Sequence, residues 1–302
     1  MKTRTLGQEL EVSEQGLGCM GMSAWYGETD EAESIATIQR ALELGIFFID
    51  TADIYGAKPG ENETLVGKAI EGHRDEVVLA TKFGKEMGDG ATRRGSREYI
   101  HAALEASLRR LQTDVIDLYQ HHEEDRGTPL EETLGALDEL VRAGKIRAYG
   151  TSNYEPETLR RARAIAGDSY VSEQSHYSWL DRAAEQELLP TCEELGLGFI
   201  PFFPLARGLL TGVVSPDTPP APGTLLYGST IERGRLEQVE RLRAWAETYG
   251  VTLLDVAIGG LAAVSPVVSV IAGATKPEQV RANAAAGEWT PTDDELAELQ
   301  SL

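Results

Sequence analysis

Residues 31–51, EAESIATIQRALELGIFFIDT, contain one complete unit of the pattern that decides the fold. Residues 31–44 carry apolar side chains at helical spacing, and Gly45 follows them directly. Glycine is common just past a helix end because it adopts the left-handed conformation without a Cβ clash. Residues 47–51 are then a short apolar run, which is typical of a buried strand. This stretch therefore predicts a helix that leads through Gly45 into a strand.

The same alternation of strand and helix continues along the whole chain. Short apolar runs rich in β-branched and aromatic residues predict eight strands, at 16–20, 47–51, 77–82, 116–121, 147–152, 170–175, 198–203 and 267–272. Stretches with helical spacing predict helices near 31–44, 62–71, 96–111, 130–143, 155–166, 184–195, 251–264 and 277–286. Repeated alternation of this kind indicates parallel strands joined by crossover helices.

Two architectures combine parallel strands with crossover helices, a closed barrel and an open doubly wound sheet. Eight units without a domain break favour the barrel, which typically needs roughly 250 residues in a single domain. We therefore predict one (β/α)8 TIM barrel over residues 1–302, with an N-terminal hairpin. Further helices near 235–249 and 292–300 are expected as C-terminal additions. The segment 213–234 is rich in proline and glycine, and we predict that it forms a long lid loop.

The composition restricts the partners of this protein. Its 302 residues include 28 Lys and Arg against 49 Asp and Glu, which gives a net charge of −21. Such an acidic chain repels phosphate backbones and anionic lipids, so neither nucleic acid nor a membrane is expected as a partner. The first residues do not predict a signal peptide and no apolar run reaches membrane-spanning length, so a cytoplasmic location is expected. Cys19 and Cys192 suggest neither a disulfide framework nor a zinc motif.

Two motifs point to other functions and are set aside. Residues 16–21, GLGCMG, match the G-x-G-x-x-G pattern, but a dinucleotide fold needs a strand before that motif and a helix opening on it. Here the motif is itself the predicted strand, so a Rossmann domain is not expected. His121 and His122 resemble metal ligands, but neighbours on a strand point to opposite faces and cannot both reach one ion. No metal is therefore expected.

Polar side chains gather where the predicted strands end. Asp50 and Lys82 each lie at the end of a strand, His122 follows another, and Tyr55 lies five residues beyond Asp50. In a barrel, the carboxyl ends of the strands form the active-site face. An aspartate beside a buried lysine keeps the ammonium charged, and that charge lowers the pKa of a neighbouring phenol. A tyrosine of this kind is expected to donate a proton to a carbonyl oxygen as hydride reaches the carbon.

These segments resemble the aldo-keto reductase superfamily over nearly the whole chain. Residues 48–56, FIDTADIYG, followed by Asn62 and Glu63, are similar to the signature around its catalytic Asp and Tyr. Residues 80–84, ATKFG, and residues 117–122, DLYQHH, are similar to the segments that carry its catalytic Lys and His.

The resemblance implies a role for each of the four residues. Tyr55 is expected as the general acid, Lys82 as the group that tunes it, Asp50 as the partner of Lys82, and His122 as the residue that orients the substrate. Counting five residues on from the start of the DLYQHH segment selects His122, and His121 is the alternative.

The resemblance also implies a nicotinamide cofactor, with NADPH expected and NADH as the less favoured alternative. The residues predicted to bind it are Gly21, Met22, Asp50, Ser152, Asn153, Gln174, Phe202, Pro204, Leu205, Arg207, Gly208, Gly273, Thr275, Lys276, Gln279 and Asn283. Phe202 and Phe203 stand where the family usually has Tyr-Ser, so a ring can still stack on nicotinamide while a hydroxyl near phosphate is lost. Gly273 and Gln279 replace the Lys and Arg of some relatives, which weakens the expected clamp on the 2′-phosphate.

We therefore predict NAD(P)H-dependent reduction of a small-molecule aldehyde or ketone to an alcohol. The residues predicted to line the substrate pocket are Trp25, Tyr26, Phe83, Tyr177 and Tyr227. One alternative is a redox-sensing regulatory subunit that binds NADPH and turns over slowly. Another is a barrel hydrolase without a cofactor. The sequence predicts neither the physiological substrate nor the oligomeric state.

Overall fold

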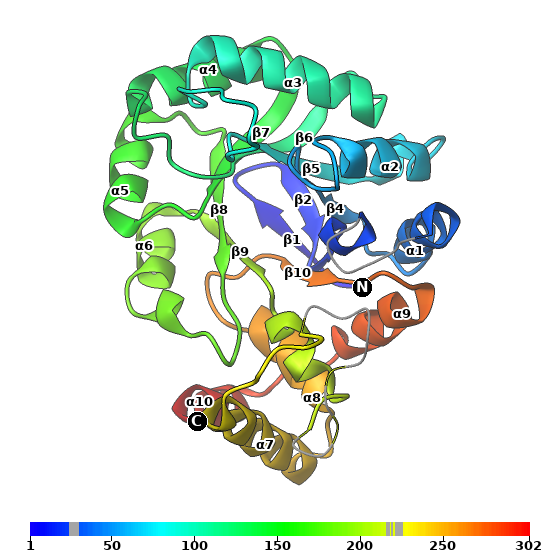
Figure 1. Ribbon diagram of the computed structural model, residues 1–302. Coiled ribbons are helices and arrows are strands. Elements are labelled where there is room, and N and C mark those ends of the chain that lie inside the picture. Colours follow the sequence, from blue (N-terminus) through cyan, green and yellow to red (C-terminus); the bar gives the residue numbers. More distant parts are fainter. Residues whose placement is uncertain (24–29, 216–217, 219, 221–225) are drawn as a thin grey trace.

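The computed structural model describes residues 1–23, 30–215, 218, 220 and 226–302. A closed barrel of parallel strands, in the order β10-β3-β4-β5-β6-β7-β8-β9, lies at its centre and is ringed by helices (Figure 1). The strands are β3 (Gln15–Gly18), β4 (Phe48–Asp50), β5 (Val78–Phe83), β6 (Ile116–His121), β7 (Ile146–Ser152), β8 (Tyr170–His176), β9 (Gly198–Phe202) and β10 (Val270–Gly273). The predicted (β/α)8 barrel is thus confirmed.

The helices form an outer ring around this barrel. They are α1 (Glu31–Glu43), α2 (Glu61–Ala69), α3 (Arg97–Leu111), α4 (Leu130–Arg142), α5 (Pro156–Ile165), α6 (Leu188–Leu195), α7 (Arg233–Thr248), α8 (Leu253–Asp255), α9 (Pro277–Ala286) and α10 (Asp293–Ser301). Neighbours along the chain pack on one another from α1 to α6, and α9 packs on α1. Helices α7 and α10 lie together at the edge of the ring (Figure 1), where Trp245 Nε1 donates to Glu298.

Local sequence signals explain several of these helix ends. Asp30 and Ser96 each accept a hydrogen bond from a backbone N–H in the first turn of the helix that follows, which satisfies a donor with no partner inside the helix. Gly45 has a φ of 79° just past α1, as the sequence predicted. The chain can therefore turn from α1 directly into β4.

An N-terminal hairpin closes the barrel at the end where the strands begin. β1 (Thr3–Leu6) pairs in antiparallel register with β2 (Leu10–Ser13). Leu6, Leu10 and Val12 are buried in one apolar cluster with inward side chains of the barrel, among them Phe48 and Val171. The hairpin thus shields the barrel interior at one end and leaves the opposite end for the site.

Four predicted elements differ from the structure. The strand predicted at 16–20 ends at Gly18, and Met20–Met22 instead form a 3₁₀ turn. The strand predicted at 267–272 begins at Val270, because Val267 makes only an isolated bridge to Phe199. The helix predicted at 251–264 is an α-helical turn followed by a π-helical turn, Val256–Gly260.

A close helix contact accompanies this π-helical turn. A Cβ at Gly259 would lie 2.3 Å from the carbonyl oxygen of Trp289, so the backbones touch at this point. The predicted helix at 184–195 is also shorter, since α6 begins at Leu188 after a separate 3₁₀ turn. Across the described ranges, no helix has the length and apolar character needed to cross a membrane.

Candidate active site

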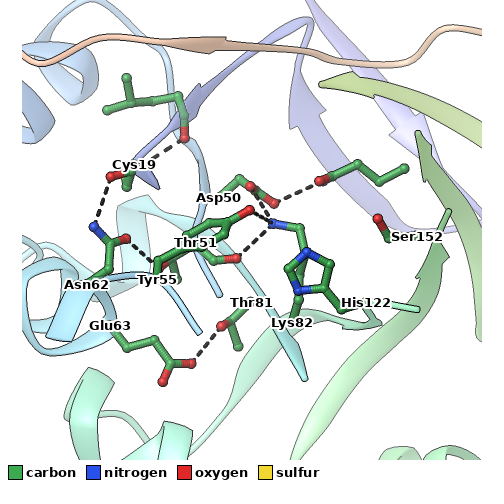
Figure 2. Close-up of polar contacts among 12 residues, drawn as sticks. Cys19, Asp50, Thr51, Tyr55, Asn62, Glu63, Thr81, Lys82, His122 and Ser152 are labelled. Atoms are coloured by element: carbon green, nitrogen blue, oxygen red, sulfur yellow. Dashed lines mark hydrogen bonds and ion pairs between the residues drawn. The ribbon is translucent and has the colours of Figure 1, made fainter. Parts of the chain in front are cut away.

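Three neighbouring strands point the predicted Asp, Lys and His into the barrel. Ala80 and Leu118 belong to the inner apolar cluster. Alternate residues of a strand face the same side, so Lys82 on β5 and His122 just after β6 also face inward. Asp50 ends the adjacent strand β4. Figure 2 shows the resulting group of side chains at the carboxyl ends of the strands.

Lys82 is the centre of this group. Its Nζ donates to Asp50 Oδ1 at 2.6 Å, to the Thr51 carbonyl at 2.9 Å and to the Tyr55 hydroxyl at 3.4 Å. The side chain is 1% exposed and that of Asp50 is 4% exposed. An ammonium has three N–H donors, and all three are used here. Its orientation toward the phenol is therefore fixed.

The neighbours of Lys82 keep it charged. Burial alone would lower the pKa of Lys82, but the Asp50 carboxylate and the Tyr55 hydroxyl more than offset this and raise the pKa above its usual value. Asp50 is itself held by Gln174, whose Nε2 donates to its Oδ2 at 2.9 Å. Asp50 on β4 thus links Lys82 on β5 to Gln174 on β8.

Tyr55 lies in the loop after β4, directly over the ammonium. Lys82 Nζ lies 5.2 Å from the centre of its ring. The imidazole of His122 stands edge-on to the same ring, with the ring centres 6.0 Å apart. Burial raises the pKa of Tyr55 above 10 although the Lys82 ammonium lowers it in part. The prediction of a net decrease in this pKa is therefore wrong for this structure, because desolvation outweighs the lysine.

His122, rather than His121, faces the site. His121 points outward, where its Nδ1 lies 2.7 Å from the Tyr154 hydroxyl and its ring stacks on Phe83. Burial, together with the charge of Lys82, holds the pKa of His122 well below 6.5. His122 is therefore a neutral imidazole at pH 7, and its buried Nδ1 has no hydrogen-bond partner within the described part of the chain.

The side chains predicted to hold the nicotinamide lie at the ends of β7 and β8. Gln174 uses Nε2 on Asp50, which leaves its Oε1 as an acceptor. Ser152 is 1% exposed, and its Oγ accepts from Asn153 Nδ2 at 3.0 Å, which leaves the serine O–H as a donor. A primary carboxamide has both donors and acceptors. The free acceptor of Gln174 and the free donor of Ser152 therefore fit the amide of a nicotinamide.

The segment after β9 has an unusual backbone. Phe203, Ala206 and Arg207 have φ values of 55°, 47° and 60°, which are strained for residues with a Cβ. The exposed guanidinium of Arg207 lies 5.6 Å from the ring centre of Phe203. Arg207 forms no ion pair within the described ranges, so its charge is available to an anion such as a pyrophosphate. Phe202, Pro204, Leu205 and Gly208 surround the same turn.

The N-terminus of α9 carries the residues predicted near the 2′ group. Gln279 Oε1 accepts from the backbone N–H groups of Thr275 and Lys276, at 2.7 and 3.2 Å. Lys276 Nζ lies 3.9 Å from a carboxylate oxygen of Glu33. Asn283 Nδ2 donates to the Gly273 carbonyl. Gln279 thus occupies the two backbone N–H groups just before α9, and Lys276 faces Glu33, which leaves fewer donors and less positive charge here for a phosphate.

Two residues predicted to line the pocket lie elsewhere, and this part of the prediction is corrected. Phe83 is fully buried and its ring stacks on Tyr119, because as the neighbour of Lys82 on β5 it points to the outer face. Tyr177 is fully buried as well, and its hydroxyl donates to Glu185. Tyr227 is 60% exposed. Trp25 and Tyr26 lie outside the described residues, as does part of the predicted lid at 213–234.

Two further residues at the site were not predicted with a role. His176, the last residue of β8, stacks flat on Phe202 with ring centres 5.6 Å apart. Asn62 hydrogen-bonds Thr51 and Cys19 (Figure 2), and it also hydrogen-bonds Ser23. Asn62 lies within the signature segment of the sequence, but its partners are 11 to 43 residues away, so no local signal identified them.

Comparison with known proteins agrees with the fold. Residues 15–302 match the Aldo/keto reductase family, and the chain belongs to it. It is thus an oxidoreductase that acts on carbonyl groups of small molecules with a nicotinamide cofactor.

Two solved structures show the relationship in detail. The holo form of aldo-keto reductase AKR11C1 from Bacillus halodurans is 38% identical, with a TM-score of 0.84 over 100% of this chain and 96% of that one. The glycerol dehydrogenase AKR11B4 from Gluconobacter oxydans is 29% identical, with a TM-score of 0.85 over 99% and 94%. Both are named as enzymes, so the alternative of a regulatory subunit gains no support.

Proposed function

We propose that this protein reduces an aldehyde or ketone to an alcohol with NADPH, and that Tyr55 donates the proton. One observation carries the proposal: the buried ammonium of Lys82 directs one of its three N–H donors to the Tyr55 hydroxyl. A neighbouring cation stabilises the phenolate that remains once the proton has left. When bound, the dihydronicotinamide supplies the hydride.

Each side chain of the group has a part in this proposal. Tyr55 gives its hydroxyl proton to the substrate oxygen, and Lys82 stabilises the phenolate. Asp50 keeps Lys82 charged at a position where burial would otherwise favour the neutral amine. His122 is neutral, so it orients the carbonyl through a ring N–H rather than acting as a second acid. Ser152, Asn153 and Gln174 would hold the carboxamide of the cofactor.

The choice between the two nicotinamide cofactors depends on α9. NADPH is the family expectation, and Arg207 with Lys276 supplies positive charge in a chain of net charge −21. NADH is the second candidate, because Gln279 already accepts from the backbone N–H groups of Thr275 and Lys276, just before α9, and Lys276 faces Glu33. A Glu33→Gln variant would release Lys276 and should shift preference toward NADPH.

A carbonyl panel tested with both cofactors decides the proposal. The panel should hold small aldehydes, keto sugars and, given the dehydrogenase among the similar structures, glyceraldehyde and dihydroxyacetone. Tyr55→Phe should abolish reduction while NADPH still binds, since it removes only the hydroxyl. Turnover at the wild-type rate in this variant would refute the role of Tyr55. Absence of NADPH or NADH binding by the wild-type protein would refute the proposed function as a whole.

A further inference from the structure

Asn62 is fully buried at the start of α2, and every polar group of its side chain is used. Its Nδ2 donates to the Cys19 carbonyl at 2.9 Å and to Ser23 Oγ at 2.8 Å. Its Oδ1 accepts from Thr51 Oγ1 at 2.6 Å. Its backbone N–H donates to the carbonyl of Tyr55 at 3.1 Å. Asn62 therefore joins α2 to two other segments of the chain, the turn at residues 19–23 and the loop at residues 51–55; Figure 2 shows its bonds to Cys19 and Thr51.

Those segments carry different halves of the proposed reaction. Cys19 and Ser23 flank the 3₁₀ turn Met20–Met22, which contains two of the predicted cofactor contacts. Thr51 supplies the carbonyl that accepts from Lys82 Nζ. Tyr55 is the proposed proton donor. Asn62 thus lies between the turn expected to touch the cofactor and the loop that holds the acid.

Only an asparagine suits this position among residues of its size. The site needs two donors directed at Cys19 and Ser23 and one acceptor directed at Thr51, which is what a short carboxamide offers. Aspartate has no such donors when ionised, and leucine has no polar atoms. A buried carbonyl or hydroxyl that loses its partner is destabilised, so the neighbouring turn would shift to find another.

The adjacent residue, Glu63, is equally buried but has other partners. Its Oε1 accepts from Thr81 Oγ1 and its Oε2 from Arg110 Nε, both at 2.6 Å. These contacts tie α2 to β5 and α3 and do not reach the turn at Met20–Met22. Glu63 therefore offers a matched control in the same helical turn.

We propose that Asn62 is a positioning residue that sets the separation between the bound cofactor and Tyr55; this inference rests on the proposed function. Proton donor and hydride donor must reach opposite ends of one C=O bond together. A displacement of about 1 Å between reacting groups can reduce the rate roughly 100-fold. Asn62 fixes this separation because its side chain hydrogen-bonds the turn at residues 19–23, and its side chain and backbone hydrogen-bond the loop at residues 51–55.

Asn62→Ala and Glu63→Gln should be compared with the wild-type protein by cofactor titration, followed through nicotinamide fluorescence. Asn62→Ala should weaken NADPH binding about tenfold, on the order expected from the loss of the hydrogen bonds that hold the turn. Glu63→Gln should lower the melting temperature but leave the dissociation constant within about twofold. With NADPH deuterated at the transferred position, the isotope effect on kcat should rise in Asn62→Ala alone, because misalignment makes hydride transfer more rate-limiting.

A merely structural role would give a different result. Asn62→Ala would then lower the active fraction without changing the dissociation constant of NADPH or the isotope effect, and this outcome overturns the proposal. If Glu63→Gln loses as much NADPH affinity as Asn62→Ala, the proposal is also overturned. If Asn62→Ala does not fold, Ser23→Ala and Ser23→Thr carry the test. If Ser23→Ala binds NADPH more weakly and Ser23→Thr binds it as the wild type does, the proposal is supported. Equal NADPH affinity in the wild-type protein, Ser23→Ala and Ser23→Thr overturns it.

Failure of this inference is distinguishable from failure of the proposed function. Wild-type turnover in Tyr55→Phe refutes the assignment of the acid, while the binding comparison at Asn62 still stands. Wild-type NADPH affinity in Asn62→Ala, alongside an inactive Tyr55→Phe, refutes only the positioning role. Absence of cofactor binding by the wild-type protein overturns both.

Discussion

Replacing Asp50 with Asn should leave a buried ammonium without its counter-ion. Among the described residues, Asp50 is the carboxylate that contacts Lys82 Nζ, at 2.6 Å. With an effective dielectric constant near 20, the attraction at that distance is about 6 kcal/mol. The Thr51 carbonyl and the Tyr55 hydroxyl remain as acceptors for Lys82 Nζ and offset part of the lost attraction. We expect Asp50→Asn to lower the free energy of unfolding by about 3–5 kcal/mol at pH 7.

A double variant separates lost attraction from an uncompensated charge. In Asp50→Asn/Lys82→Met both charges are gone, and methionine fills much of the space of the lysine stem. The double variant should therefore be more stable than Asp50→Asn alone by about 2 kcal/mol. It should still be inactive, because no ammonium remains beside Tyr55. Recovery of stability without recovery of activity would show that Lys82 is retained for chemistry rather than for the fold.

The assay is urea unfolding of the wild-type protein, Asp50→Asn, Lys82→Met and the double variant, at pH 7 and pH 9.5. In Asp50→Asn the pKa of Lys82 in the folded state should drop below its unfolded value, near 10.4. The folded state then binds fewer protons than the unfolded state between these values, so its stability rises with pH in that window. The deficit of Asp50→Asn should shrink at pH 9.5. The reasoning would be refuted if the stability changes of the two single variants added to that of the double variant within about 0.5 kcal/mol. It would also be refuted if the stability deficit of Asp50→Asn did not depend on pH.

Two further predictions concern the framework around the site. Burial raises the pKa of Glu173 to about 7 from its usual value near 4.5, so the folded state binds the extra proton and loses stability as pH rises from 4.5 through 7. Thermal unfolding of Glu173→Gln should show its largest stability gain over wild type at pH 8 and little at pH 5; a gain independent of pH would contradict this. In α2, a Cβ at Gly67 would lie 2.7 Å from the Arg110 carbonyl, so Gly67→Ala should destabilise by about 1–3 kcal/mol. A Cβ at Gly135 in α4 would meet nothing within 4 Å, so Gly135→Ala should stabilise the protein by about 0.5–1 kcal/mol. If both variants change stability in the same direction, contact between helices is not the cause of the effect at Gly67.

The barrel was predictable because its signals are local and repeated. Gly45 ends α1 as expected, and strand and helix alternate from end to end. One error in element bounds arises where distant backbone intervenes. The π-helical turn Val256–Gly260 lies where the carbonyl of Trp289 approaches Gly259, and no short window of sequence contains that contact.

The residues of the site were also predictable, but their surroundings were only partly so. The signature segments contain Asp50, Tyr55, Lys82 and His122, and the structure brings all four together. The alternation of side chains on β5 could have shown that Phe83 points away from the pocket, since it follows the inward-facing Lys82. The buried position of Tyr177 had no comparable signal, because its partner Glu185 lies in a separate turn.

The sequence by itself determined the repeated helix–strand unit, the closure expected of eight such units, and the identity of the polar residues at the strand ends. Tertiary structure alone decided which of these groups touch. Gln174 reaches Asp50 across 124 residues of chain, and Asn62 reaches Cys19 across 43. It also decided that burial outweighs Lys82 in setting the pKa of Tyr55. Backbone propensity acts within a few residues, whereas hydrogen bonding and desolvation depend on which distant segments the closed barrel brings together.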